Sequence, residues 1–144
     1  MALKILIVED EPILAIELEC IVKEMGHEVV GVARSSHGAV ALAQTGEPDL
    51  ALVDVHLTDG PTGPEAARQI AGDRGATVLF TTSNPERVPA DFANACGVLT
   101  KPYSDQGIKS AINFISECMA NGAASRPAPH MLKLAPNYRE RWRV

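Results

Sequence analysis

The residue that most clearly could take part in a reaction is Asp54, which interrupts the apolar stretch LALVDVHL at residues 50–57. Burying an unpaired carboxylate is costly, so a neighbouring residue or an ion must neutralise it. The acidic run EDE at residues 9–11 and the basic residue Lys101 are the candidates that could share a site with it. A carboxylate held ionised beside a cation can act as a nucleophile, provided that the fold brings these groups together.

Short apolar runs alternate along the chain with segments of helical periodicity. Strands are predicted at residues 3–8, 28–33, 50–53, 77–81 and 96–99. Helices are predicted from Pro12 to Gly26, from a cap at Ser36 to Gly46, over residues 65–71, and from a cap at Ser104 and Asp105 through Met119. This alternation favours an α/β fold with a doubly wound parallel sheet and helices on both faces.

The carboxyl ends of these strands are where ligands bind in an open α/β sheet. The polar groups expected at that edge are Glu9 and Asp10 after the first strand, Asp54 after the third, Thr81 and Thr82 at the end of the fourth, and Lys101 after the fifth. Crowded carboxylates repel one another, and Mg²⁺, which favours one or two carboxylates with waters and phosphate oxygens, would relieve that repulsion. Asp54 would then be held ionised by the metal and Lys101, and its oxygen could form an acyl phosphate.

Four stretches of the chain resemble the receiver domain of response regulators. They are ILIVEDE at residues 5–11, LALVDVHL at 50–57, VLFTTS at 78–83 and LTKPY at 99–103. They occur at the expected strand ends and together span nearly all of residues 1–120. The resemblance implies a flavodoxin-like fold with five parallel strands in the order 2-1-3-4-5, and a cis peptide bond before Pro102.

The resemblance also implies roles for the acidic residues. Asp54 would be the phospho-acceptor. The Mg²⁺ ligands would be Asp10, Asp54 and the backbone carbonyl of His56, with Glu9 binding nearby or through water.

Two further roles follow from the same resemblance. Thr82 would supply the hydroxyl that follows the phosphoryl group, and Lys101 would be the cation on the phosphate side. Thr81 competes with Thr82 for the first role, and Thr82 is preferred because a small residue, Ser83, should follow it.

The chain departs from the common receiver pattern in three places. The loop HLTDGPTGPE at residues 56–65 is long and rich in glycine. The interval from 82 to 101 is short and holds two prolines, which predicts a short or irregular fourth helix. Val98 stands where an aromatic residue is common. These features resemble alphaproteobacterial receivers of the general-stress-response type, including a stand-alone group with a Phe-x-Thr motif, here at residues 80–82. They predict signalling through ordering of residues 84–92.

Charge is distributed unevenly along the 144 residues. Residues 1–120 carry 17 acidic and 8 basic side chains, whereas residues 121–144 carry 1 acidic and 5 basic. We therefore expect a receiver domain over residues 1–120, a poor binder of nucleic acid, and a basic, proline-containing tail over residues 121–144.

The apolar runs are too short to span a membrane, and no secretory signal opens the chain, so a cytoplasmic protein is expected. The tail, which holds Trp142, is expected to be a disordered, solvated end; the alternative is a segment that folds against this protein or a partner.

The favoured function is a single-domain response regulator of a two-component system or phosphorelay. It would accept a phosphoryl group from a sensor histidine kinase or histidine phosphotransfer protein, in a Mg²⁺-dependent step. It would then act through protein–protein interaction or as a phosphate sink, in an oligomeric state that the sequence leaves open. An alternative is a receiver-like interaction module that works without phosphorylation. A phosphohydrolase is disfavoured because His56 replaces the second acid of such enzymes. As a receiver, the protein is not expected to be an enzyme beyond catalysing its own phosphotransfer and its own dephosphorylation.

Overall fold

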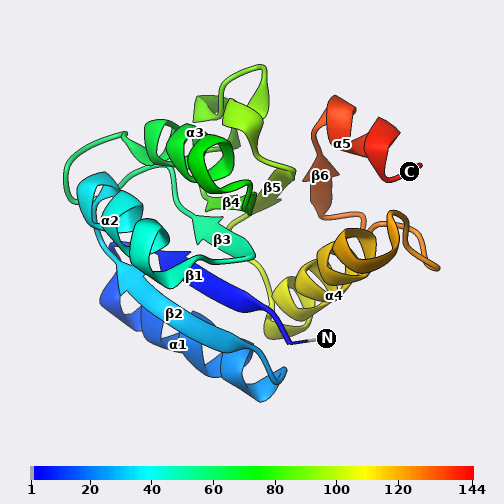
Figure 1. Ribbon diagram of the computed structural model, residues 1–144, viewed down its shortest axis with the longest axis horizontal. Helices are drawn as coiled ribbons and strands as arrows, with labels where there is room; N and C mark the ends of the chain where they lie inside the picture. Colours follow the sequence, from blue (N-terminus) through cyan, green and yellow to red (C-terminus); the bar gives the residue numbers. More distant parts are fainter. Residues whose placement is uncertain (1) are drawn as a thin grey trace.

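The computed structural model describes residues 2–144 as an α/β fold built on one six-stranded sheet (Figure 1). The strands are β1 (Lys4–Val8), β2 (Glu28–Ala33), β3 (Leu50–Val53), β4 (Thr77–Thr82), β5 (Gly97–Thr100) and β6 (Leu132–Leu134). Their order is β2-β1-β3-β4-β5-β6; the first five pair in parallel and β6 pairs antiparallel to β5. The predicted order of the five parallel strands is thus confirmed, whereas β6 was not predicted from the sequence.

Helices cover both faces of the sheet. They are α1 (Pro12–Glu24), α2 (Ser36–Gly46), α3 (Gly63–Arg74), α4 (Asp105–Asn121) and α5 (Pro136–Arg141). One core cluster joins the sheet to α1 and α4, and a second joins it to α2 and α3. The α2 and α3 face is lined by small side chains such as Ala39, Ala43 and Ala66, which let these helices lie close to the strands. The central strands β3 and β4 are buried along their whole length, as expected for parallel strands covered on both sides.

The helix starts show how the sequence sets local structure. The side chain of Ser104 caps α4 by accepting a hydrogen bond from the Gly107 N–H, as predicted. For α2 the cap is Ser35, whose Oγ accepts from the Gly38 N–H at 3.0 Å, and not Ser36 as the sequence suggested. Ser36 is instead the first residue of the helix, where its hydroxyl bonds the carboxylate of Asp59.

Two short 3₁₀ turns, η1 (Pro85–Arg87) and η2 (Phe92–Asn94), replace a regular helix between β4 and β5. The expectation of a short or irregular fourth helix is thus confirmed. All three residues of η2 adopt left-handed backbone conformations, with φ of 59°, 50° and 66°. Residues other than glycine rarely adopt this backbone conformation, so η2 stores conformational strain.

Residues 132–142 fold back on the sheet, so the expectation of a solvated end is wrong for this segment and the alternative, a segment that folds against this protein, holds. β6 lies at the edge opposite β2 and leads into α5 (Figure 1). The rings of Tyr138 and Trp142 are buried and meet edge to face, with centroids 4.9 Å apart, and the guanidinium of Arg141 lies over the Tyr138 ring. Within residues 2–144, no helix has the length and apolar character needed to cross a bilayer.

Candidate functional site

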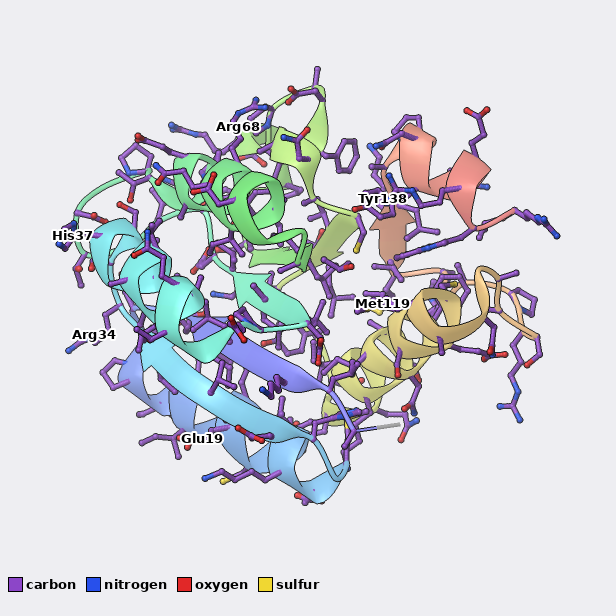
Figure 2. The ribbon with its side chains drawn as sticks, viewed as in Figure 1. Glu19, Arg34, His37, Arg68, Met119 and Tyr138 are labelled. Atoms are coloured by element: carbon purple, nitrogen blue, oxygen red, sulfur yellow. The ribbon has the colours of Figure 1, made fainter. Side chains whose placement is uncertain are left out.

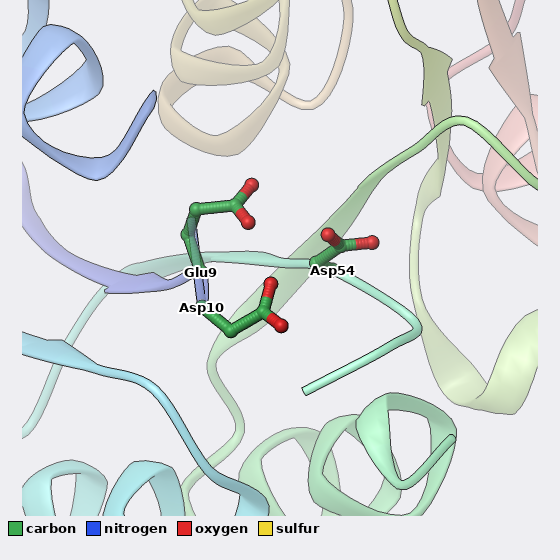
Figure 3. A group of neighbouring side chains, drawn as sticks. All are labelled: Glu9, Asp10 and Asp54. Carbon is green, nitrogen blue, oxygen red and sulfur yellow. The ribbon is translucent and has the colours of Figure 1, made fainter. Parts of the chain in front are cut away.

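The site begins where β1 ends. The Glu9 N–H donates to the Ala33 carbonyl at 2.9 Å and continues the ladder between β1 and β2. The Glu9 side chain is 1% exposed, while that of Asp10 is only partly buried. Figure 3 shows the carboxylates of Glu9, Asp10 and Asp54 gathered at this edge of the sheet.

Asp54 follows β3 directly and is fixed through its backbone. Its N–H donates to the Val8 carbonyl at 2.9 Å, which ties it to the end of β1. A Cβ added to Gly63 would overlap the Asp54 carbonyl, so the close approach of α3 to this segment requires glycine. Of the carboxylate oxygens, Oδ1 accepts from the Val55 N–H at 2.7 Å and Oδ2 accepts from Lys101 at 2.8 Å. The buried carboxylate is therefore paired.

Lys101 connects the two buried carboxylates. It follows β5 and is joined to Pro102 by a cis peptide bond, as the resemblance implied. Its ammonium donates to Glu9 Oε1 at 2.7 Å and to Asp54 Oδ2 at 2.8 Å. Burial alone would lower the pKa of Lys101, but its hydrogen bonds to Asp54 and Glu9 outweigh burial and raise that pKa. The ammonium stays charged.

One cation does not balance the acidic groups. Burial raises the pKa of Glu9 to about 7, although hydrogen bonds from Lys101 and from the Glu11 N–H oppose the shift. Glu9, Asp10 and Asp54 each place a carboxylate oxygen within 4.8 Å of the others. Three carboxylates so close together, beside one ammonium, form a donor set suited to a hard divalent cation. The residues present therefore fit Mg²⁺.

The remaining predicted residues lie around this cluster. Thr82 ends β4, is fully buried, and accepts a hydrogen bond from the Asn84 N–H on Oγ1 at 3.0 Å. Its carbonyl accepts from the Lys101 N–H at 2.9 Å, so the ends of β4 and β5 are joined at the site. His56 lies two residues beyond Asp54, half-buried, at the start of the long loop. Ligation by its backbone carbonyl stays a prediction, as do the individual roles of the other site residues.

Arg34 is a neighbour of the site that the sequence reading did not single out. Its guanidinium donates to the Asp10 carbonyl at 3.1 Å, and its own carbonyl accepts from the N–H and the hydroxyl of Thr58. It thereby joins the loops that follow β1, β2 and β3, and Figure 2 shows it at the rim of the molecule. An arginine after a predicted strand gives no signal of such a contact, because the partners lie far away in sequence.

Comparisons with known proteins agree with this geometry. The family model described as the response regulator receiver domain matches residues 5–113. The chain is 36% identical to the phyllosphere-induced regulator PhyR of Methylorubrum extorquens over 115 residues, covering 78% of this chain and 43% of PhyR. It is 30% identical to protein PilH of Pseudomonas aeruginosa, covering 78% of this chain and 96% of PilH. The solution structure of the receiver domain of Erythrobacter litoralis PhyR is 28% identical with a TM-score of 0.71, covering 89% and 96% of the two chains.

Proposed function

The chain belongs to the response regulator receiver family, and from this premise we propose that it is a phosphorylated signalling switch with Asp54 as the acceptor. The observation that carries the proposal is the hydrogen-bonded network of Glu9, Lys101 and Asp54, with Asp10 beside it. Members of the family are regulators, and the matched segment is less than half of PhyR. The activity and partners given below are therefore our proposal for this chain.

In the proposed reaction, an Asp54 carboxylate oxygen attacks the phosphorus of a phosphohistidine on a sensor kinase or a phosphotransfer protein. An O–P bond forms as the P–N bond breaks, and the imidazole nitrogen keeps the electron pair and takes up a proton. Lys101 pairs with the Asp54 carboxylate in the resting site and offers positive charge to the phosphoryl oxygens. The product is an acyl phosphate on Asp54.

Mg²⁺ would be held by Asp10 and Asp54, with Glu9 nearby or through water and the His56 carbonyl completing the set. When bound, it would neutralise charge on the phosphoryl group during transfer. The hydrogen bond from the Asp54 N–H to the Val8 carbonyl fixes the position of the phospho-acceptor residue. Burial of Glu9 excludes water from one side of the site.

Thr82 would carry the signal out of the site. Its hydroxyl proton is free to turn toward a phosphoryl oxygen. Asn84 donates its N–H to the same hydroxyl oxygen, so Asn84 would move with the Thr82 side chain. The irregular segment at residues 84–92 would then reorder and change what the protein binds. Output by protein–protein interaction or by drawing phosphate away from another receiver fits a receiver over residues 1–120 with residues 121–144 as an accessory, working in the cytoplasm beside its kinase.

Phosphorylation with acetyl phosphate and Mg²⁺, followed by intact-protein mass spectrometry, tests the proposal. The wild type should gain one phosphoryl group, and it should gain none when Mg²⁺ is chelated beforehand. Asp54→Asn should gain none, whereas Asp73→Asn, which changes an exposed carboxylate on α3, should behave as the wild type. Incorporation into Asp54→Asn at the wild-type level would place the acceptor elsewhere. Unchanged signalling by Asp54→Asn in cells would favour the phosphorylation-independent module instead.

A further inference from the structure

The segment comprising β6 and α5, residues 132–142, is here called the strap. It pairs with a single strand: Leu132 lies opposite Leu99, Lys133 opposite Val98 and Leu134 opposite Gly97. The next hydrogen bond, from the Ala135 N–H to the Cys96 carbonyl at 2.7 Å, extends the same pairing. Without the strap, β5 would be the edge strand of the parallel sheet.

The strap is attached firmly yet locally. Its inward side chains are buried in the core cluster of α1 and α4; they are Leu132, Leu134, Ala135, Tyr138 and Trp142. Residues 122–131, which connect it to α4, contain no helix or strand and include two prolines. A short element with one strand partner and an irregular connection can separate from the sheet without unfolding the five parallel strands.

The absence of a side chain at Gly97 lets the strap lie close to β5. A Cβ built on Gly97 would overlap the Lys133 carbonyl, and its next two nearest atoms also belong to Lys133 and Leu134. All three of these nearest contacts thus come from the strap and none from the parallel strands or helices. An added methyl group at Gly97 therefore acts against strap docking in particular.

The strand that holds the strap also positions the site. β5 runs directly into Lys101, whose ammonium bonds Glu9 and Asp54. The opposite edge of β5 pairs with β4, and the Lys101 N–H donates to the Thr82 carbonyl at 2.9 Å. β5 is therefore held between Thr82 on one side and the strap on the other.

A cavity of about 240 Å³ gives this arrangement room to move. It is lined by Val98 and Thr100 of β5, by Lys133 of the strap, and by the segment at residues 85–92 that follows Thr82. That segment leads into the strained left-handed residues of η2. A shift of residues 85–92 toward Asp54 would withdraw one wall of this cavity from the strap.

We propose that the strap is a latch coupled to the site: phosphorylation of Asp54 loosens the strap from β5, and loosening the strap favours phosphorylation. The inference rests on the proposed function. A ligand that moves Thr82 and Lys101 acts on β5 at its β4 edge and at its carboxyl end, and the strap lies on the other edge of the same strand. Linkage requires any such coupling to be reciprocal. The docked strap thus stabilises the resting form of the protein.

Trp142, the chain's single tryptophan, reports the state of the strap because it is 4% exposed when docked. The probe is trifluoroberyllate with Mg²⁺, which mimics a phosphoryl group on a carboxylate. Binding is followed by ¹⁹F NMR, with Asp54→Asn as the control, and strap docking by the emission wavelength of Trp142. In the wild type, saturation with the probe should shift the emission to the red.

Two variants weaken docking from opposite sides. Gly97→Ala acts from β5, and Leu134→Ala acts from the strap and keeps β5 intact; both should bind the probe about fivefold tighter or more, within the usual range of coupling between sites. Met131→Ala, an exposed position beside β6, should bind as the wild type. Asp54-dependent binding with a silent Trp142 and unchanged affinity in both variants would overturn the latch and leave the proposed function standing. Absence of Asp54-dependent binding in the wild type would overturn both.

Discussion

Replacing Lys101 with methionine removes the cation that joins the two buried carboxylates and keeps a side chain of similar length. The Lys101 side chain is 12% exposed and those of Glu9 and Asp54 are 1% and 10% exposed, at N–O distances of 2.7 and 2.8 Å. Removing one partner of a buried ion pair costs about 3–5 kcal/mol because the other is left unpaired. Since Asp54 is reached by some water and also bonds the Val55 N–H, the expected loss lies near the lower end, at about 3 kcal/mol.

Urea unfolding followed by Trp142 fluorescence measures this loss, first in the presence of a chelator. Mg²⁺ at about 100 times its dissociation constant should restore about 2.7 kcal/mol, since an ion that binds only the folded state stabilises it by mass action. The matched control is Lys109→Met, which removes a looser pair with the exposed Glu24 at 3.5 Å and should cost less than about 1 kcal/mol. Two results would refute this reasoning: a loss below about 1 kcal/mol for Lys101→Met, or no recovery of stability with Mg²⁺. Either would show that Lys101 does not neutralise buried carboxylates that can also bind a divalent cation.

Three further outcomes are expected. Without divalent ions, the free energy of unfolding should fall as pH rises from about 4.5 to 7, because the pKa of Glu9 is about 7 when folded and lower when unfolded; Glu9→Gln should flatten this part of the pH profile. Asn94→Gly should be more stable than Asn94→Ala by about 1 kcal/mol in urea unfolding, because φ is 66° at this position and alanine has a Cβ that glycine lacks. Gly63→Ala should slow acetyl phosphate labelling and lower the melting temperature, because its Cβ would displace the backbone that carries Asp54; equal labelling rates would show that this backbone can shift freely.

Much of the fold could be predicted because the apolar runs and the helical spacing are strong local signals. The four residues before Asp54, LALV, are all apolar, so their burial as β3 followed from composition alone. The three-residue strand β6 could not be found in the same way, because LKL is too short to stand out and its partner lies more than 30 residues away. The start of α2 was misplaced by one residue because Ser35 and Ser36 are both good caps, and only the contact of Ser36 with Asp59 separates them.

The site was predictable in its members more than in its connections. Acidic residues after β1 and β3 and a lysine after β5 must meet at one edge of a parallel sheet, whatever the details of packing. That Lys101 would bond Glu9 as well as Asp54 depends on side-chain placement, which the sequence does not specify. The contact of Arg34 with the Asp10 carbonyl depends on the path of a loop and was missed for the same reason.

The missing side chain at Gly97 also limits which residues this position can hold. Any other residue would place a Cβ against the Lys133 carbonyl, so the six-stranded sheet as it stands requires glycine there. A variant with a larger residue at position 97 must shift the pairing of β6 with β5 or lose it.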